Sequence, residues 1–127
     1  MTGTGQGAVY ASTVTQVGNQ VQAFLDHGIL IFFGDNAPSE LHDMSVLHRV
    51  QVADDGPRPG DTINLGEASL EILAVGDVVR DNLLNLGHLD LKADGRTEAK
   101  LPGDVCVSPG RLPLLSPGEA FSITRPT

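Results

Sequence analysis

Four histidines, at positions 27, 42, 48 and 88, are the side chains of this 127-residue chain best suited to chemistry near neutral pH. A neutral imidazole carries a nucleophilic lone pair, so a histidine can accept a phosphoryl group. Such a transfer needs one ring nitrogen open to the donor and the other held by a hydrogen bond that fixes the tautomer. A lone histidine is more commonly a surface or structural residue, so its position in the predicted fold has to show whether it is a candidate for chemistry.

His48 has the most favourable position of the four. It lies in an alternating segment, Val46–Val52, on the same side as three valines. This pattern predicts a strand with the ring directed toward an apolar face. Two interpretations follow: a partly buried histidine bonded to the backbone, or a ring at the floor of a depression where a partner excludes water.

The other histidines have weaker positions. His88 follows Gly87 and opens a segment that alternates like a strand. It either bonds the end of a preceding helix or supports His48 as a second site histidine. His42, between Glu40 and Asp43, and His27, next to Asp26, are expected to be exposed.

Rival chemistries find less support in the sequence. No HEXXH or Cys-X-X-Cys motif occurs, and His42 and His48 straddle an expected helix–strand junction, so no metal site is expected. The Gly-X-Ser-X-Gly motif of serine hydrolases is also absent. Cys106 has valine on both sides, which favours a small buried hydrophobe, and Asp104, two residues earlier, gives its thiolate no stabilisation.

Composition narrows the class of protein further. Eight Lys and Arg against 16 Asp and Glu give a net charge of −8, which argues against nucleic acid and anionic membrane surfaces as partners. A single cysteine excludes an internal disulfide and fits a reducing compartment. The longest strongly apolar run, Ile29–Phe33, is too short to span a bilayer, and no signal peptide is recognisable. We therefore expect a cytoplasmic protein that reaches a membrane only through a partner.

The remaining patterns predict one all-β domain over residues 8–127, preceded by a flexible tail, 1–7. Short apolar or alternating segments separated by Gly- and Pro-rich turns favour a small, closed or nearly closed antiparallel barrel. One or two short helices are expected, at Pro38–Met44 and at Val79–Leu86, and Gly87 fits the end of the latter. A further turn of helix is expected at Val21–Leu25. The expected strands are Val9–Val17, Ile29–Phe33, Val46–Val52, Thr62–Leu65, a strand within Ser69–Val79, His88–Lys92, Asp104–Val107 and Ala120–Thr124.

Two stretches carry a family resemblance. The first, ILIFFGDNAPSELHDMSVLH, spans residues 29–48 and contains Gly-X-X-Ala-Pro-X-X-Leu ahead of Leu-His. The second, AVGDVVRDNLLNLGHLDLKADG, spans residues 74–95 and contains Asp-Asn-Leu-X-X-Leu-Gly-His, with EAKLPG following at 98–103. Together they resemble the glucitol/sorbitol-specific enzyme IIA component of the bacterial phosphotransferase system, and the resemblance extends over about Val9 to Thr124.

The resemblance implies a function and partners. The position matching the family's phosphorylated histidine is His48, and His88 also matches, with a supporting role. The phosphocarrier protein HPr would donate the phosphoryl group to His48, which would pass it to a cysteine on the IIB domain of a IIB/IIC sugar permease. No cofactor is implied. The family fold is a small β-barrel, in agreement with the strand pattern.

Some alternatives stay open at this level. A non-catalytic β-barrel adaptor that kept the fold and lost phosphoryl transfer is the competing class. The sequence identifies neither the sugar nor the oligomeric state, and a homodimer is not excluded. An acidic chain has few cations to hold phosphoryl oxygens, so backbone N–H groups and a partner's own basic residues are candidates for that task. Arg49 adjoins His48 but should point to the opposite strand face, and Asn82 and His88 are further candidates.

Overall fold

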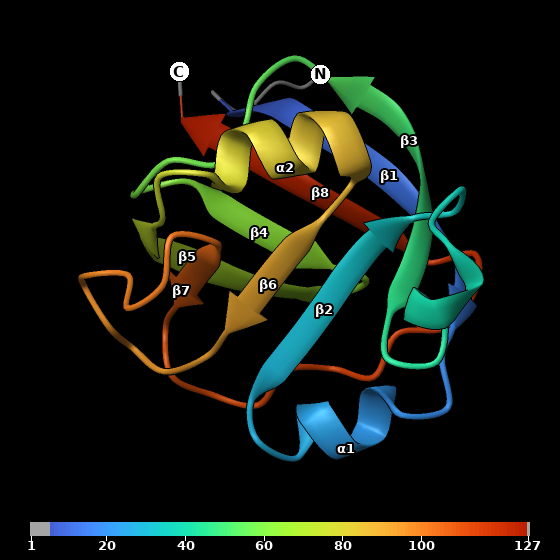
Figure 1. Ribbon diagram of the computed structural model, residues 1–127. Coiled ribbons are helices and arrows are strands. Elements are labelled where there is room, and N and C mark those ends of the chain that lie inside the picture. Colours follow the sequence, from blue (N-terminus) through green and yellow to red (C-terminus); the bar gives the residue numbers. More distant parts are fainter. Residues whose placement is uncertain (1–5, 127) are drawn as a thin grey trace.

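The computed structural model describes residues 6–126, which form a closed barrel with the strand order β1-β3-β2-β6-β7-β5-β4-β8. Figure 1 shows the barrel with α2 across one end and α1 at the opposite end. The strands are β1 (Gln6–Val17), β2 (Ile29–Gly34), β3 (Val46–Ala53), β4 (Thr62–Leu65), β5 (Ala68–Val75), β6 (Leu89–Lys92), β7 (Asp104–Val107) and β8 (Ala120–Pro126). The helices are α1 (Val21–Leu25), α2 (Val79–Leu86) and the 3₁₀ turn η1 (Ser39–Leu41).

The prediction of a closed barrel with short helices is confirmed. The structure differs from the sequence-based expectation in the direction of two strand pairs and in the bounds of two elements. Two of the ladders, β2–β3 and β6–β7, are parallel, and the others are antiparallel. Each parallel pair is joined by a crossover segment, residues 35–45 and 93–103, as parallel neighbours require. The helix expected at Pro38–Met44 is only the 3₁₀ turn η1. Strand β1 begins at Gln6, inside the predicted tail 1–7, and residues 1–5 lie outside the described part of the chain.

Alternating apolar side chains fill the barrel. In β2 the buried positions are Leu30 and Phe32, and in β6 they are Leu89 and Leu91. The rings of Phe32 and Phe121 stack with their centroids 4.5 Å apart, and both side chains are completely buried. Burial of this apolar area drives the strands to close around a single core.

Helix α2 caps one end of this core. Its buried residues are Val79 and Leu83, one turn apart, whereas Leu86 at its last position is 54% exposed. The helix ends at Gly87, whose φ of 64° is in the left-handed region. A Cβ at this position would lie 2.7 Å from the backbone nitrogen of Gly34, so glycine is required both by conformation and by close approach. The end of α2 is therefore held directly against the end of β2.

Helix length limits what these elements can do at a membrane. Within residues 6–126, no helix combines the length and the apolar character needed to cross a bilayer.

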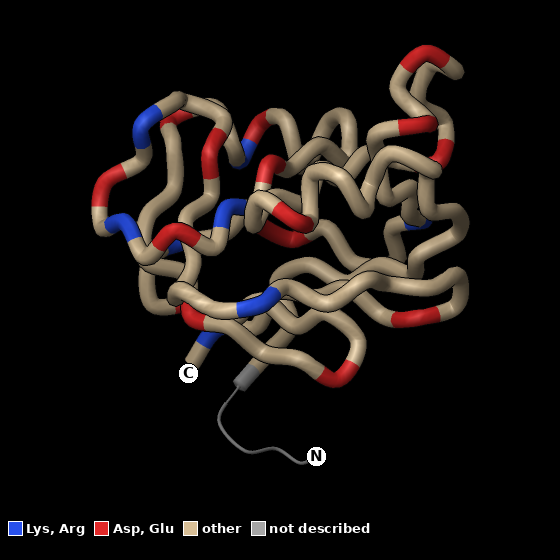
Figure 2. The backbone as a smooth tube through the Cα atoms, turned by 90° about the horizontal axis from the view of Figure 1, so that it is seen from below, with Lys and Arg blue, Asp and Glu red and all other residues tan. Residues whose placement is uncertain are grey.

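The basic residues are largely engaged in ion pairs. Figure 2 shows Asp and Glu spread around the whole backbone, with fewer Lys and Arg among them. Six of the eight basic side chains pair with a carboxylate: Arg49, Arg58, Arg80, Lys92, Arg96 and Arg125. The unpaired charge left at the surface is therefore predominantly negative.

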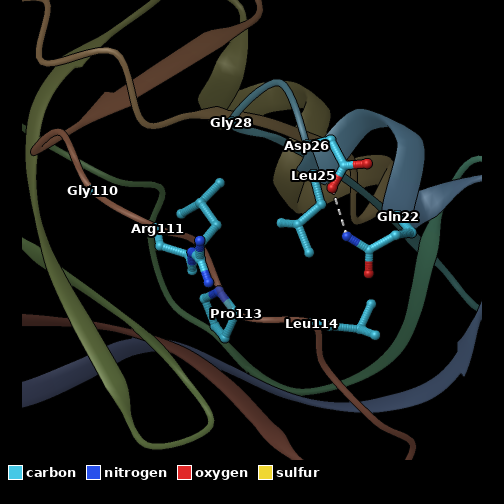
Figure 3. Close-up of a pocket in the computed structure, with 9 residues that line it drawn as sticks. Gln22, Leu25, Asp26, Gly28, Gly110, Arg111, Pro113 and Leu114 are labelled. Atoms are coloured by element: carbon cyan, nitrogen blue, oxygen red, sulfur yellow. Dashed lines mark hydrogen bonds between the residues drawn. The ribbon is translucent and has the colours of Figure 1, made fainter.

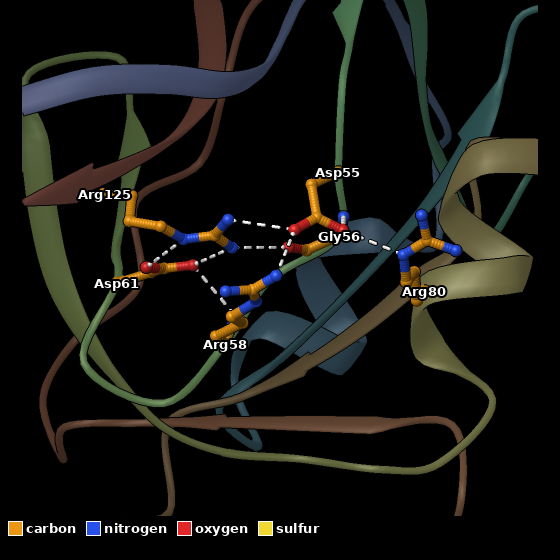
Figure 4. Close-up of polar contacts among 6 residues, drawn as sticks. All are labelled: Asp55, Gly56, Arg58, Asp61, Arg80 and Arg125. Atoms are coloured by element: carbon orange, nitrogen blue, oxygen red, sulfur yellow. Dashed lines mark hydrogen bonds and ion pairs between the residues drawn. The ribbon is translucent and has the colours of Figure 1, made fainter. Parts of the chain in front are cut away.

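One ion-pair network fastens α2 to the barrel (Figure 4). The Arg125 guanidinium in β8 donates to both carboxylate oxygens of Asp61 at 2.9–3.0 Å and to Asp55 at 2.9 Å. Arg80, in the first turn of α2, donates to the other oxygen of Asp55 at 2.8 Å. Asp55 thus links the last strand to the start of α2. Hydrogen bonds from Arg80 and Arg125 lower the pKa of Asp55 well below its ordinary value of 3.8.

Replacing Arg125 with alanine tests this network. Arg125→Ala leaves the almost fully buried Asp61 without its charge partner, and we expect the free energy of unfolding to fall by about 3 kcal/mol in urea denaturation at pH 7. Because the folded-state pKa of Asp55 is lowered, its contribution is present above pH 3.8 and is lost as the pH falls below that value. The stability gap between the two proteins should therefore narrow at acid pH.

The matched control is Arg96→Ala. Arg96 is 53% exposed and pairs with one half-exposed carboxylate, Asp94, so its loss should cost less than about 1 kcal/mol. Equal effects of the two substitutions would show that the Arg125 network does not fasten the barrel.

Candidate functional site

The imidazole of His48 lies inside the barrel near the end capped by α2. Its side chain is completely buried, beside three aromatic rings from β1, β2 and β8. The ring centroids are 6.2 Å from Tyr10, 6.1 Å from Phe32 and 5.3 Å from Phe121, all in edge-on arrangements. The strand predicted around His48 is confirmed, and the ring is more deeply enclosed than the alternating pattern implied.

Both ring nitrogens of His48 have hydrogen-bond partners. Nδ1 is 2.6 Å from Ser12 Oγ, and Nε2 is 2.7 Å from the backbone oxygen of Gly87. A carbonyl oxygen can only accept, so Nε2 carries the proton and donates it to Gly87. Nδ1 then accepts from the Ser12 hydroxyl. The expectation of an open nitrogen is therefore not met in this state of the protein.

Long-range strand pairing brings these groups together. Val14 of β1 lies opposite His48 of β3, and the ladder shifts register on both sides of this pair, next to Ser12 and next to Gln16. Such irregularities redirect side chains and are common beside functional sites. In the parallel β2–β3 ladder, Gly34 is paired with His48. The end of α2 packs against Gly34, and this contact brings the Gly87 carbonyl next to the His48 ring.

A pocket of about 290 Å³ opens beside the ring. Its lining comes from β1, the β2–η1 turn, β3 and the second half of α2: Tyr10, Gly34, Asp35, Asn36, His48, Val50, Ala53, Leu83, Leu84, Asn85, Leu86 and Gly87. Gly87, the partner of Nε2, belongs to this lining and Ser12, the partner of Nδ1, does not, so we infer that the Nε2 edge of the imidazole is the one nearer the pocket. Of the two hydrogen-bond partners of the ring, the Gly87 carbonyl is the one that covers Nε2.

Burial keeps this ring neutral. It lowers the pKa of His48 below its ordinary value of 6.5, and the hydrogen bond to Gly87 and the nearby Asp35 carboxylate oppose that shift only in part. A neutral imidazole at physiological pH retains the lone pair that nucleophilic chemistry requires.

The His88 ring is held away from this pocket. It stacks on Phe33, with the ring centroids 4.1 Å apart, and its Nδ1 donates to the backbone oxygen of Phe32 at 3.2 Å. Its Nε2 lies 3.7 Å from Asp90, and His88 is not part of the pocket lining. The link to His48 runs through the chain, because the preceding residue, Gly87, is the one that accepts from His48 Nε2.

The remaining candidates lie apart from the imidazole. His42 bonds the backbone oxygen of Ala37 at 2.8 Å and is only partly exposed, whereas His27 is exposed as expected. Arg49 is 72% exposed and pairs with Asp35 at 3.2 Å, so it points away from the ring, as the strand alternation predicted. Asn82 lies within α2 and is not part of the pocket lining.

Cys106 is an inert thiol. It is completely buried in β7, with Sγ 3.9 Å from an oxygen of Asp94. Burial, reinforced by that carboxylate, raises the pKa of the Cys106 thiol to about 11. The interpretation of Cys106 as a small buried side chain is confirmed.

Neither of two other cavities has a buried histidine in its lining. One, of about 270 Å³, is lined by the exposed His27 together with Lys92, Arg96 and Lys100 among other residues. A larger pocket of about 770 Å³ lies between α1 and residues 110–114 and has no histidine in its lining (Figure 3). Within residues 6–126, no three His, Cys, Asp or Glu side chains come together in an arrangement suited to a metal ion.

Three groups of this site were not identified from the sequence: the Ser12 hydroxyl, the Gly87 carbonyl and the Tyr10 ring. Ser12 and Gly87 lie 36 and 39 residues from His48 along the chain, and their contacts depend on strand register and helix docking. The only local signal was the glycine that ends α2.

Comparison with known proteins gives a consistent result. The family model described as the PTS system glucitol/sorbitol-specific IIA component matches residues 9–122. The glucitol/sorbitol-specific EIIA components of Shigella flexneri and Escherichia coli K12 are each 34% identical over 114 residues, which is 89% of this chain and 92% of theirs. The crystal structure of a PTS system IIA component from Enterococcus faecalis V583 is similar with a TM-score of 0.74 and 25% identity, over 87% of this chain and 96% of that one.

The buried imidazole makes a pH-dependent contribution to stability that can be measured. Because the folded-state pKa of His48 is lowered, the unfolded chain binds a proton that the native ring does not as the pH falls below 6.5. Between pH 7.5 and pH 5 the wild type should therefore lose stability relative to His48→Gln, by up to about 1.4 kcal/mol per pH unit below 6.5. Urea denaturation across this range measures the difference.

His27→Gln is the control, since its imidazole is exposed. It should keep the wild-type dependence on pH. A His48→Gln profile parallel to the wild type would contradict the neutral, desolvated ring.

Proposed function

The chain belongs to the glucitol/sorbitol-specific IIA components of the phosphotransferase system, which carry phosphoryl groups during sugar uptake, and on this premise we propose that His48 is the residue that carries the phosphate. The single observation that supports His48 over the other histidines is its place in the barrel: a neutral, buried imidazole with its Nε2 edge toward a pocket. His27 is exposed and lines a separate pocket of about 270 Å³, His42 bonds the Ala37 carbonyl outside the His48 pocket, and His88 stacks outside the lining of that pocket.

Phosphorylation at Nε2 requires two local changes. The Gly87 carbonyl has to leave Nε2, and the ring has to move its proton from Nε2 to Nδ1. Ser12 can serve both tautomers, because a hydroxyl donates to a bare Nδ1 and accepts from a protonated one. The Nε2 lone pair then forms the bond to phosphorus as the bond from phosphorus to the donor breaks, and that bond's electron pair stays with the donor.

The partners follow from the same chemistry. We propose that HPr supplies the phosphoryl group and that a cysteine on the IIB domain of a sugar permease receives it, with both exchanges at the cytoplasmic side of the membrane. Two exposed apolar side chains, Val50 and Leu86, line the pocket beside His48 and support a docking role for this end of the barrel. A docked partner would exclude water from the reacting nitrogen.

Phosphate labelling tests this proposal. Incubation with phosphoenolpyruvate, enzyme I and HPr should place one acid-labile phosphate on the protein, and a purified sorbitol-type IIB domain should remove it. His48→Gln should abolish labelling, whereas His27→Gln, with its exposed side chain, should label as the wild type does. Peptide mapping by mass spectrometry locates the phosphate.

Two results would count against the proposal. Full labelling of His48→Gln would exclude His48 as the acceptor. Absence of labelling in a correctly folded wild type would favour the competing function, a β-barrel adaptor without transfer.

His88 is expected to have a lesser, indirect role. Its stacking on Phe33 and its bond to Phe32 steady the segment that begins with Gly87. We expect His88→Ala to remain phosphorylatable and to transfer about two- to tenfold more slowly, because a misplaced Gly87 alters the orientation of His48. Rapid-quench measurement of transfer in both directions checks this, and unchanged rates would exclude the supporting role.

A further inference from the structure

The hydroxyl of Tyr10 is buried without a hydrogen-bond partner. Tyr10 projects from β1 into the barrel and its side chain is completely buried. Within residues 6–126, its hydroxyl makes no hydrogen bond. Buried hydroxyl groups in native proteins are nearly always bonded, so an unpartnered one on a residue that lines a pocket calls for an explanation.

This hydroxyl belongs to a side chain that shares the His48 pocket. Tyr10 and His48 both line the cavity of about 290 Å³, and their ring centroids are 6.2 Å apart, with the rings inclined at 69°. Burial raises the pKa of Tyr10 further above its ordinary value of 10, so its hydroxyl is protonated and able to donate near neutral pH.

The pocket offers a phosphoryl group few other donors. A phosphoryl group carries a charge between about −1.5 and −2 near neutral pH and needs positive or donating groups around its oxygens. Among the described residues, no Lys or Arg lines the pocket, and its one ionisable acid, Asp35, is engaged by Arg49. The side-chain amides of Asn36 and Asn85 are exposed, so water competes for them.

We propose that the Tyr10 hydroxyl donates a hydrogen bond to an oxygen of the phosphoryl group on His48 and is thus a further catalytic residue. The inference rests on His48 being the acceptor. The tyrosine keeps its proton throughout: the Nε2–phosphorus bond forms, the bond from phosphorus to the donor nitrogen breaks, and the hydroxyl contacts one of the three oxygens that hold the charge.

The resting state makes this contact effective. Because the Tyr10 hydroxyl has no protein partner before transfer, donating to the phosphoryl group costs no existing hydrogen bond. An interaction that is made only with the transferring group lowers the barrier rather than merely strengthening binding of the partner. On this proposal, the Tyr10 hydroxyl lacks a partner in the unphosphorylated protein because its partner is the phosphoryl group.

The test compares two variants that each remove one buried, unpartnered hydroxyl. Tyr10→Phe keeps the ring and removes the donor. Thr15→Val is its match, because the Thr15 hydroxyl is the other unpartnered one among the described residues and is not part of the pocket lining. In rapid-quench transfer from phosphorylated HPr, Tyr10→Phe should be at least tenfold slower in kcat with little change in the KM for HPr, and Thr15→Val should match the wild type.

A spectroscopic series covers the case in which Tyr10→Phe folds poorly. Tyr10 is the only tyrosine in the chain, so biosynthetic incorporation of 3-fluorotyrosine changes this hydroxyl alone and makes it a stronger donor. The ³¹P resonance of phosphorylated His48 should shift one way with 3-fluorotyrosine and the opposite way in Tyr10→Phe. Wild-type rates in Tyr10→Phe, or an identical ³¹P shift across the series, would overturn the role of Tyr10.

The outcomes separate this inference from the proposed function. A wild type that carries phosphate on His48 while Tyr10→Phe transfers normally refutes only the role of Tyr10. A wild type that takes no phosphate on His48 refutes the acceptor assignment and with it this inference.

Discussion

The hydrogen bond from His48 Nε2 to the Gly87 carbonyl links the chemistry of the site to the architecture around it. It joins a buried ring on β3 to the end of α2, at 2.7 Å, inside a closed barrel. The ring nitrogen can gain a substituent only if the helix end gives way, because a phosphoryl group and a carbonyl oxygen cannot occupy the same place. With His48 as the proposed phosphate acceptor, its phosphorylation state and the position of the α2 end would be mutually dependent. The opposite end of α2 is fastened through Arg80 and Asp55, so movement is expected to concentrate at Gly87.

The remaining contacts of the ring account for its neutrality and orientation. Ser12 holds Nδ1 from the barrel wall, and three aromatic rings enclose the imidazole. This environment disfavours the protonated, charged form of His48 and favours the neutral ring. The neutral ring has a free lone pair without needing an adjacent carboxylate as base. The described pocket lining includes no Lys or Arg, so a phosphoryl group on the proposed acceptor would depend on neutral donors of this chain or on basic groups of a partner.

Local patterns were sufficient for the strands but not for how they pair. Alternation and turn residues placed the strands within a few residues of their observed ends, and Gly87 marked the end of α2. The parallel pairing of β2 with β3 depends on the path of the crossover that contains η1. The local pattern of a short segment does not determine that path. His48 was singled out as a candidate because a family motif and an alternating strand pointed to the same residue, and its role stays a prediction. Ser12, Tyr10 and the Asp55–Arg125 network were missed because their partners lie far away along the chain.

The single cysteine has a practical consequence. Cys106 is sealed in β7, and its thiol stays protonated near neutral pH. Thiol-directed reagents should thus find the natural protein almost unreactive. A cysteine introduced at the exposed Leu86 would be the only site that accepts a fluorophore or spin label, and its signal would report when the helix end separates from the imidazole.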